Sequence, residues 1–186
     1  YFQDHKHQLN KISKSNAAHS TLILDNSSAC SFKKNKNGFN IIDRGFKTFD
    51  KEILNNKKIW IIRGSHDGYL KDYGVIHQRN LEFNFDLNKI IGKDKLIKKK
   101  NFKSTSFEIR FHLLPNAKIT KVQDNRSVLI EIENSGWRFY SDSGSIDIET
   151  GLYFGKKSTF SENQNIFISG VTQNEDQIIR WEITKI

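Results

Sequence analysis

The chain has 186 residues, the size of about one domain, and its 36% apolar content is enough for one hydrophobic core. The mean hydropathy is -0.63 and no run of apolar residues is long enough to span a bilayer, so we expect no membrane span. The single cysteine, Cys30, excludes an internal disulfide and a zinc ribbon built on paired cysteines. Because the chain starts at Tyr1 and contains no methionine, we expect it to be part of a longer protein.

Positive charge is concentrated in the first two thirds of the chain. Residues 1–125 carry 24 basic and 12 acidic side chains, whereas residues 126–186 carry 6 and 9. A one-sided basic field favours an anionic partner, such as nucleic acid, an anionic membrane surface or an acidic polysaccharide. The lysine-rich stretches at 33–37 and 93–103 are most simply interpreted as solvated hairpin loops. Only Phe102 interleaves with the second stretch, so we do not expect a nucleic-acid partner.

The hydrophobic pattern has a period of two, which is typical of strands with one buried and one wetter face. In chain order, the predicted strands are 21–25, 58–63, 73–85, 87–96, 107–113, 117–123, 128–132, 137–141, 145–152, 165–169 and 179–183. Turn signals rich in Asn, Asp, Ser and Gly separate many of them. No stretch keeps a period of 3.6 residues, so we expect no helix longer than about two turns.

These patterns predict an all-β fold, either an antiparallel β-sandwich or stacked antiparallel sheets. We expect residues 1–186 to form a single domain. Residues 1–16 are polar and are interpreted as an incomplete lead-in segment that is left exposed.

Common catalytic signatures are absent, since the chain has no Gly-rich phosphate loop, no GxSxG, no HExxH and no paired cysteines. Six histidines remain. His5 and His7 are two apart and could grip a metal together on an extended chain. They lie in a polar terminus, however, and exposed non-ligating histidines are the simpler interpretation.

Three further histidines lie on or beside predicted strands. His66 and Asp67 share a turn, where the carboxylate could orient the imidazole or cap the loop. His77 lies on the same face of its strand as Arg79, and His112 lies on the polar face of its strand. For His77 and His112 we expect a strand histidine that is hydrogen-bonded to a neighbour.

His19 has a different setting, because it follows Ala17 and Ala18 and directly precedes an apolar strand. Small neighbours allow backbone or substrate to approach closely. On chemistry alone, a packed structural histidine is still the simpler interpretation.

The segment 17–25 resembles the alanine-histidine-asparagine/serine-threonine motif of heparinase II/III-like polysaccharide lyases. The resemblance extends from about Ser13 to Thr184. No single motif is very specific, but their joint order and spacing are. The other matching segments are, in the same order, 64–69, 73–79, 109–115, 136–139 and 179–183.

The resemblance implies that the chain is a C-terminal region of stacked antiparallel sheets, preceded by a helical toroid domain that would be its partner within the same protein. Enzymes of this family cleave uronic-acid-containing polysaccharides by β-elimination, in which a base removes the C5 proton. Their tyrosine, histidine and asparagine lie mainly on the toroid. We therefore expect no catalytic residue in this chain, an active lyase in the parent protein and an inactive isolated chain.

The resemblance also implies a zinc site built from a His-x-His pair, a downstream Asp and the histidine of the alanine-histidine motif. Only the last has a counterpart here, and we expect His19 to be the single zinc ligand that this chain contributes. His5 and His7 are not the family's pair, which lies further upstream. A buried structural histidine is the alternative for His19.

An acidic polysaccharide is the expected partner outside the protein, and the periplasm or cell envelope is the location that the resemblance implies. The alternative function is a non-catalytic glycan-binding or scaffolding β domain, in a parent whose toroid has lost its catalytic residues.

Overall fold

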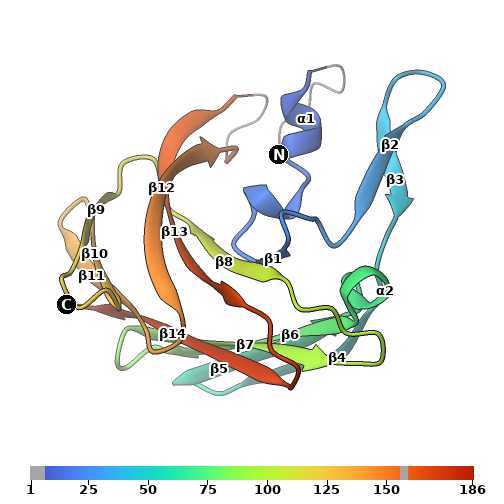
Figure 1. Ribbon diagram of the computed structural model, residues 1–186. Coiled ribbons are helices and arrows are strands. Elements are labelled where there is room, and N and C mark those ends of the chain that lie inside the picture. Colours follow the sequence, from blue (N-terminus) through green and yellow to red (C-terminus); the bar gives the residue numbers. More distant parts are fainter. Residues whose placement is uncertain (1–6, 156–158) are drawn as a thin grey trace.

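The computed structural model describes residues 7–155 and 159–186, and within them strands dominate (Figure 1). Every strand pairing is antiparallel. The small sheet consists, in spatial order, of β1 (Leu22–Leu24), β8 (Ser106–His112), β13 (Ser161–Val171) and β12 (Ser145–Tyr153). The large sheet consists, in spatial order, of β4 (Thr48–Asn55), β5 (Ile59–His66), β6 (Val75–Asn84), β7 (Lys89–Lys98), β14 (Gln177–Lys185), β11 (Ser135–Ser141), β10 (Ser127–Ile132) and β9 (Lys118–Lys121).

The remaining elements are short. Strands β2 (Ser31–Lys34) and β3 (Asn40–Arg44) form a hairpin that stands apart from both sheets at the right of Figure 1. Helices α1 (Leu9–Ile12) and α2 (Leu70–Tyr73) span four residues each, and η1 (Asn16–Ala18) is one 3-10 turn. In the part of the chain that is described, no helix has the length and apolarity needed to cross a membrane.

The two sheets stack and enclose the hydrophobic core between them (Figure 1). At its centre, the ring of Phe111 on β8 lies 4.7 Å from the ring of Phe139 on β11 and 4.6 Å from that of Trp181 on β14, measured between centroids. Burial of large apolar side chains, these aromatic rings included, favours folding. The predicted all-β, stacked antiparallel fold is confirmed, and each predicted strand overlaps an observed one.

Two expectations about exposed segments are correct only in part. The lysine-rich stretch 93–103 is not a loop throughout, because the predicted strand 87–96 includes its first four residues and β7 continues for two more, to Lys98. Residues 7–16 are not simply an exposed lead-in, since Asn10 and Ser13 are buried and the Asn40 side-chain amide donates a hydrogen bond to Asn10 Oδ1 at 3.0 Å. A polar segment can be buried when its polar groups find partners, and composition does not reveal those partners.

The end of this segment is anchored beside β1. The side-chain amide of Asn16 donates hydrogen bonds to the Leu22 carbonyl and to Tyr69 Oη, each at 3.0 Å. Tyr69 Oη in turn donates to the Leu22 carbonyl at 2.8 Å, and burial raises the pKa of this phenol far above its usual range. These contacts hold the chain in place three residues before His19.

Candidate functional site

The outer face of the small sheet carries the first group of candidate residues. On β8, Phe107, Ile109 and Phe111 are buried against the large sheet. Side chains alternate along a strand, so Arg110 and His112 lie on the opposite face, as the sequence predicts. The β8 backbone also holds the segment before β1, because the Arg110 N–H donates to the Thr21 carbonyl and the His112 N–H donates to Ser20 Oγ, both at 3.0 Å.

These backbone contacts bring His19 and His112 to one pocket of about 340 Å³. The two histidines are 93 positions apart in the sequence, and nothing in the pattern of either segment indicates that they meet. The pocket is lined by Ser13, Ala18, His19, Ser20, His112, Tyr153, Phe154 and Gly155.

Each imidazole lies close to a backbone carbonyl of the N-terminal segment, that of Ser13 for His19 and that of Ala17 for His112. Burial lowers the pKa of both side chains, and the carbonyls only partly oppose this effect. His112 Nε2 is buried without a hydrogen-bond partner, so the expectation of a strand histidine hydrogen-bonded to a neighbour is not confirmed for His112.

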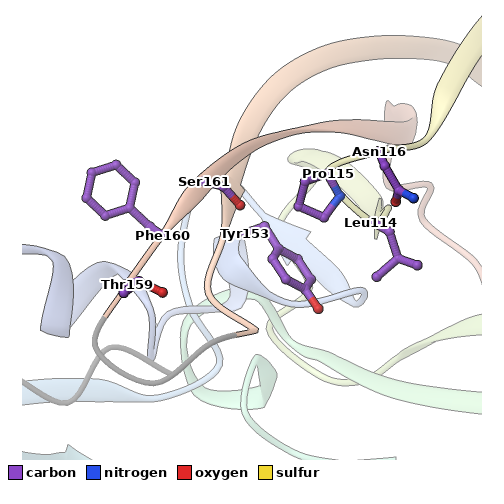
Figure 2. Close-up of a pocket in the computed structure, with 7 residues that line it drawn as sticks. All are labelled: Leu114, Pro115, Asn116, Tyr153, Thr159, Phe160 and Ser161. Carbon is purple, nitrogen blue, oxygen red and sulfur yellow. The ribbon is translucent and has the colours of Figure 1, made fainter.

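A second pocket, of about 650 Å³, adjoins the first and shares Tyr153 with it. In Figure 2 the Tyr153 ring lies beside Leu114 and Pro115, and Phe160 projects on the other side. Tyr153 at the end of β12 is the register partner of Ser161 at the start of β13. The outer face of the small sheet is therefore hollowed around one tyrosine.

The guanidinium of Arg110, also on this face, is already neutralised. It donates two hydrogen bonds to Glu108 Oε2, at 3.0 and 2.7 Å, and bonds Glu149 Oε1 from its third nitrogen. With two carboxylates in contact, Arg110 has no charge to spare for an anionic ligand.

The second group of candidate residues lies on the inner face of the large sheet and forms one hydrogen-bonded chain. The Gly68 N–H donates to His66 Nδ1 at 3.2 Å, which leaves His66 Nε2 to donate to His77 Nδ1 at 3.1 Å. His77 Nε2 then donates to Asp94 Oδ1 at 2.6 Å. This arrangement requires a neutral His66, and burial lowers its pKa to about 4, with smaller effects from neighbouring charges.

Asp94 is fully buried and accepts four hydrogen bonds. Besides His77, Arg79 donates to both carboxylate oxygens, from Nε at 2.7 Å and from a terminal nitrogen at 3.1 Å, and Trp181 Nε1 donates at 2.8 Å. Burial on its own would raise the pKa of Asp94, but Arg79 and His77 outweigh it and hold this pKa far below its usual range. A buried carboxylate needs such complete pairing.

A pocket of about 260 Å³ opens beside these hydrogen-bonded side chains, between β4, β5, β6 and Thr21, the residue before β1. It offers no free imidazole nitrogen, because both ring nitrogens of His66 and of His77 are engaged. We therefore interpret the hydrogen-bonded row of buried side chains as structural. The pocket beside it is lined by Thr21, Thr48, Lys51, Gly64, Ser65, His66, His77 and Arg79.

The structure pairs histidines that the sequence presents separately. His77 is hydrogen-bonded to a neighbour, as predicted, and His66 is its partner. His7 is exposed, and His5 lies outside the described residues. Within residues 7–155 and 159–186, there is no group of three or more His, Cys, Asp or Glu side chains that could hold a metal ion.

Comparison with known proteins identifies the family. Residues 1–182 match the family described as "Heparinase II/III-like, C-terminal". This chain belongs to that family. A curated relative is FtsZ-localized protein C of Caulobacter vibrioides, which is 28% identical over 129 residues, or 64% of this chain and 22% of that protein.

Solved structures share the fold at low sequence identity. The heparan sulfate lyase HepC of Pedobacter heparinus superposes with a TM-score of 0.75 at 14% identity, over 96% of this chain and 25% of that one. A heparinase III superposes with a TM-score of 0.62 at 13% identity, over 93% of this chain and 24% of that one. This chain thus spans about a quarter of the length of these relatives, and corresponds to the C-terminal β domain of heparinase-like proteins.

Proposed function

We propose that this chain is the C-terminal β domain of a polysaccharide lyase that cleaves an anionic, uronic-acid-containing glycan by β-elimination. The family match over residues 1–182 carries this proposal. The basic first two thirds of the chain, with 24 basic against 12 acidic side chains, supports an anionic glycan independently. β-Elimination produces negative charge next to the uronate carboxylate, which positive and hydrogen-bonding groups stabilise.

We further propose that His19 is a zinc ligand of the complete protein. The setting of its imidazole supports this role, because the ring lies close to the Ser13 carbonyl and lines a pocket. Ligating histidines in proteins usually donate their other ring N–H to such a carbonyl or to a carboxylate, which fixes the orientation of the ring. A bound zinc ion would contribute folding free energy by linking His19 to ligands elsewhere in the protein.

Two roles follow for this chain: His19 holds the metal, and the anchored segment before β1 positions His19. The groups that abstract and deliver protons come from outside residues 1–186. We place the protein in the periplasm or cell envelope, where uronate-containing glycans are accessible to it.

The proposal is tested with the full-length protein. Incubation with heparan sulfate and with alginate should produce the absorbance of an unsaturated uronate product. His19→Ala should lower the zinc content and the thermal stability together, because one change removes both the ligand and the cross-link. Unchanged zinc content in this variant would make His19 an ordinary packed histidine.

A non-catalytic glycan-binding or scaffolding domain is the second candidate. One observation favours it, since the relative from Caulobacter vibrioides is named for its localisation with FtsZ. This function predicts that the full-length protein retains a uronate-containing glycan without changing its chain length. Glycan size analysis after incubation separates the two functions.

A further inference from the structure

Two basic side chains lie directly opposite each other on the outer face of the large sheet, the face turned away from the small sheet (Figure 1). Lys93 on β7 and Arg180 on β14 are register partners, and both are exposed. Their neighbours in sequence, Asp94 and Trp181, are buried on the inner face. Like charges directly opposite each other destabilise a sheet, so this pair calls for an explanation.

Neither of the two charges is neutralised. Among residues 7–155 and 159–186, no ion pair includes Lys93 or Arg180. The other basic side chains on this face of β5 and β7 each have a carboxylate partner. Arg63 pairs with Glu52 at 3.3 Å, Lys89 with Glu182 at 2.6 Å and Lys95 with Asp176 at 2.9 Å.

The carboxylates beside Arg180 are engaged elsewhere. Asp142 and Glu182 line the same small pocket as Arg180, which has a volume of about 140 Å³. Glu182 pairs with Lys89, and Asp142 accepts a hydrogen bond from Ser143 Oγ at 2.5 Å. Two positive charges therefore remain available to a partner with negative charge.

The pair belongs to a row that crosses four strands. The register places Arg63, Asn80, Lys93 and Arg180 side by side on β5, β6, β7 and β14. Neighbouring strands are about 4.8 Å apart, so the row is about 14 Å long. A row of this length on an open sheet face fits an extended partner with repeated charges better than it fits a single small anion. The half-buried amide of Asn80 lies within the row, where it can hydrogen-bond hydroxyl groups.

We propose that this row is a second binding surface for a linear acidic polysaccharide. Carboxylate or sulfate groups of the glycan contact Lys93 and Arg180 and remove their repulsion, and sugar hydroxyls contact Asn80. Nucleic acids also carry repeated charges, but the row has no aromatic side chain on which a base could stack.

The inference rests on the proposed function for the class of glycan and goes beyond it in location. The row lies on the opposite side of the domain from the pocket that contains His19, because that pocket is on the outer face of the small sheet. A polysaccharide held at a second surface stays at a high effective concentration around the rest of the protein.

The test measures binding of the full-length protein to immobilised heparan sulfate, with alginate as a second glycan. Lys93→Gln combined with Arg180→Gln should bind about fivefold more weakly than wild type, the effect expected for the loss of two exposed ionic contacts. Lys93→Arg combined with Arg180→Lys keeps both charges and should restore most of the binding. The Gln variant should unfold at the same or a higher urea concentration than wild type, because the repulsion is gone.

Lys34→Gln combined with Lys36→Gln is the matched control, since it removes two exposed lysines of the β2–β3 hairpin and the same net charge. Equal losses of binding in the control and in the Gln variant overturn the proposal, because they show a response to net charge alone. Stronger binding of double-stranded DNA or anionic vesicles than of either glycan, lost in the same Gln variant, overturns the glycan as the occupant. A wild-type protein that binds neither glycan also overturns the proposal. Binding without cleavage contradicts the lyase function and leaves this surface standing.

A measurement on the wild-type protein needs no substitution. Lysine amines are acylated with an N-hydroxysuccinimide ester, and mass spectrometry of peptides reports the rate at each lysine. Bound heparan sulfate should slow the acylation of Lys93 several-fold and leave that of Lys34 and Lys36 unchanged. Equal acylation of Lys93 with and without the glycan overturns the proposal.

Discussion

Protonation of His66 would break the hydrogen-bonded chain that joins Gly68 to Asp94. A neutral His66 accepts a hydrogen bond from the Gly68 N–H at Nδ1 and donates to His77 from Nε2. A charged imidazole has two donors and no acceptor, so the contact with Gly68 becomes repulsive. This row of hydrogen bonds therefore forms only when the His66 side chain is neutral.

This requirement makes the stability of the domain depend on pH. The pKa of His66 is about 4 in the folded protein and about 6.5 in an unfolded chain, so the unfolded state binds the proton first as the pH falls. The free energy of unfolding should be at its full value above pH 6.5 and should decrease between pH 6.5 and 4, by about 2 kcal/mol from pH 7 to 5. Urea denaturation at each pH measures this decrease.

His66→Gln should reduce that decrease, whereas His7→Gln, at an exposed site, should not. Some pH dependence will remain in His66→Gln, because burial lowers the pKa of His19 and His112 as well and both act in the same direction. An equal decrease in wild type and His66→Gln would contradict the assignment of the effect to His66.

Single residues differ in how far the sequence alone reveals them. The position of His77 on the same strand face as Arg79 can be predicted from the period of two. The burial of Asp94 cannot be predicted in this way, because Asp94 lies within the lysine-rich stretch and looks like part of a solvated run of charges. One signal was available. Gly92, Asp94 and Leu96 are two residues apart and therefore share one face of the strand, and in the structure this face is buried.

On strand β7, the absence of a side chain at Gly92 leaves room for the Trp181 indole in the core. Gly92 is the register partner of Trp181 on β14, and the indole lies over it. A Cβ atom at Gly92 would come within 2.1 Å of the Trp181 ring, whereas a Cβ at Gly64 on β5 would meet nothing within 4 Å. The same indole donates the hydrogen bond that completes the pairing of Asp94.

Gly92→Ala should therefore destabilise the domain by about 3 kcal/mol or more, since the indole must move and its bond to Asp94 is weakened. Gly64→Ala is the matched control, as a strand glycine of the same sheet with free space, and it should change stability by less than about 1 kcal/mol. Chemical denaturation measures both values, and near-UV circular dichroism reports on Trp181. Equal stabilities of the two variants would show that the indole adapts without loss.

Elements with regular alternation could be predicted, and irregular ones could not. Strand β8 alternates without interruption and was expected almost to the residue. Strand β4 was missed because Ile53 and Leu54 are adjacent and a bulge interrupts its pairing between Phe49 and Glu52. The neighbouring apolar residues Ile41 and Ile42 hide β3 in the same way. A bulge or a two-sided strand removes the period on which the prediction depends.

On the scale of the whole molecule, the inner face of the large sheet extends beyond the small sheet that covers its centre. Ile53 and Ile62 lie in the same cross-strand row as the buried Trp181, yet Ile53 is 71% exposed. Trp60 and Phe85, 5.7 Å apart between ring centroids, are also about half exposed. An apolar face of this kind usually marks an interaction surface.

The last prediction concerns the chain on its own. Residues 1–186 should fold cooperatively, because the core between the two sheets is built entirely from this chain. They should not turn over heparan sulfate or alginate, since the proposal assigns the groups that abstract and deliver protons to the rest of the protein, and Arg110 is neutralised by two carboxylates. The isolated chain should also self-associate as its concentration rises, through the apolar face at β4 and β5. Circular dichroism and the absorbance of the unsaturated product are measured at low concentration, with the full-length protein as the positive control for activity. Sedimentation over a series of concentrations measures self-association. Product formed by the isolated chain would show that the chemistry lies within this β domain.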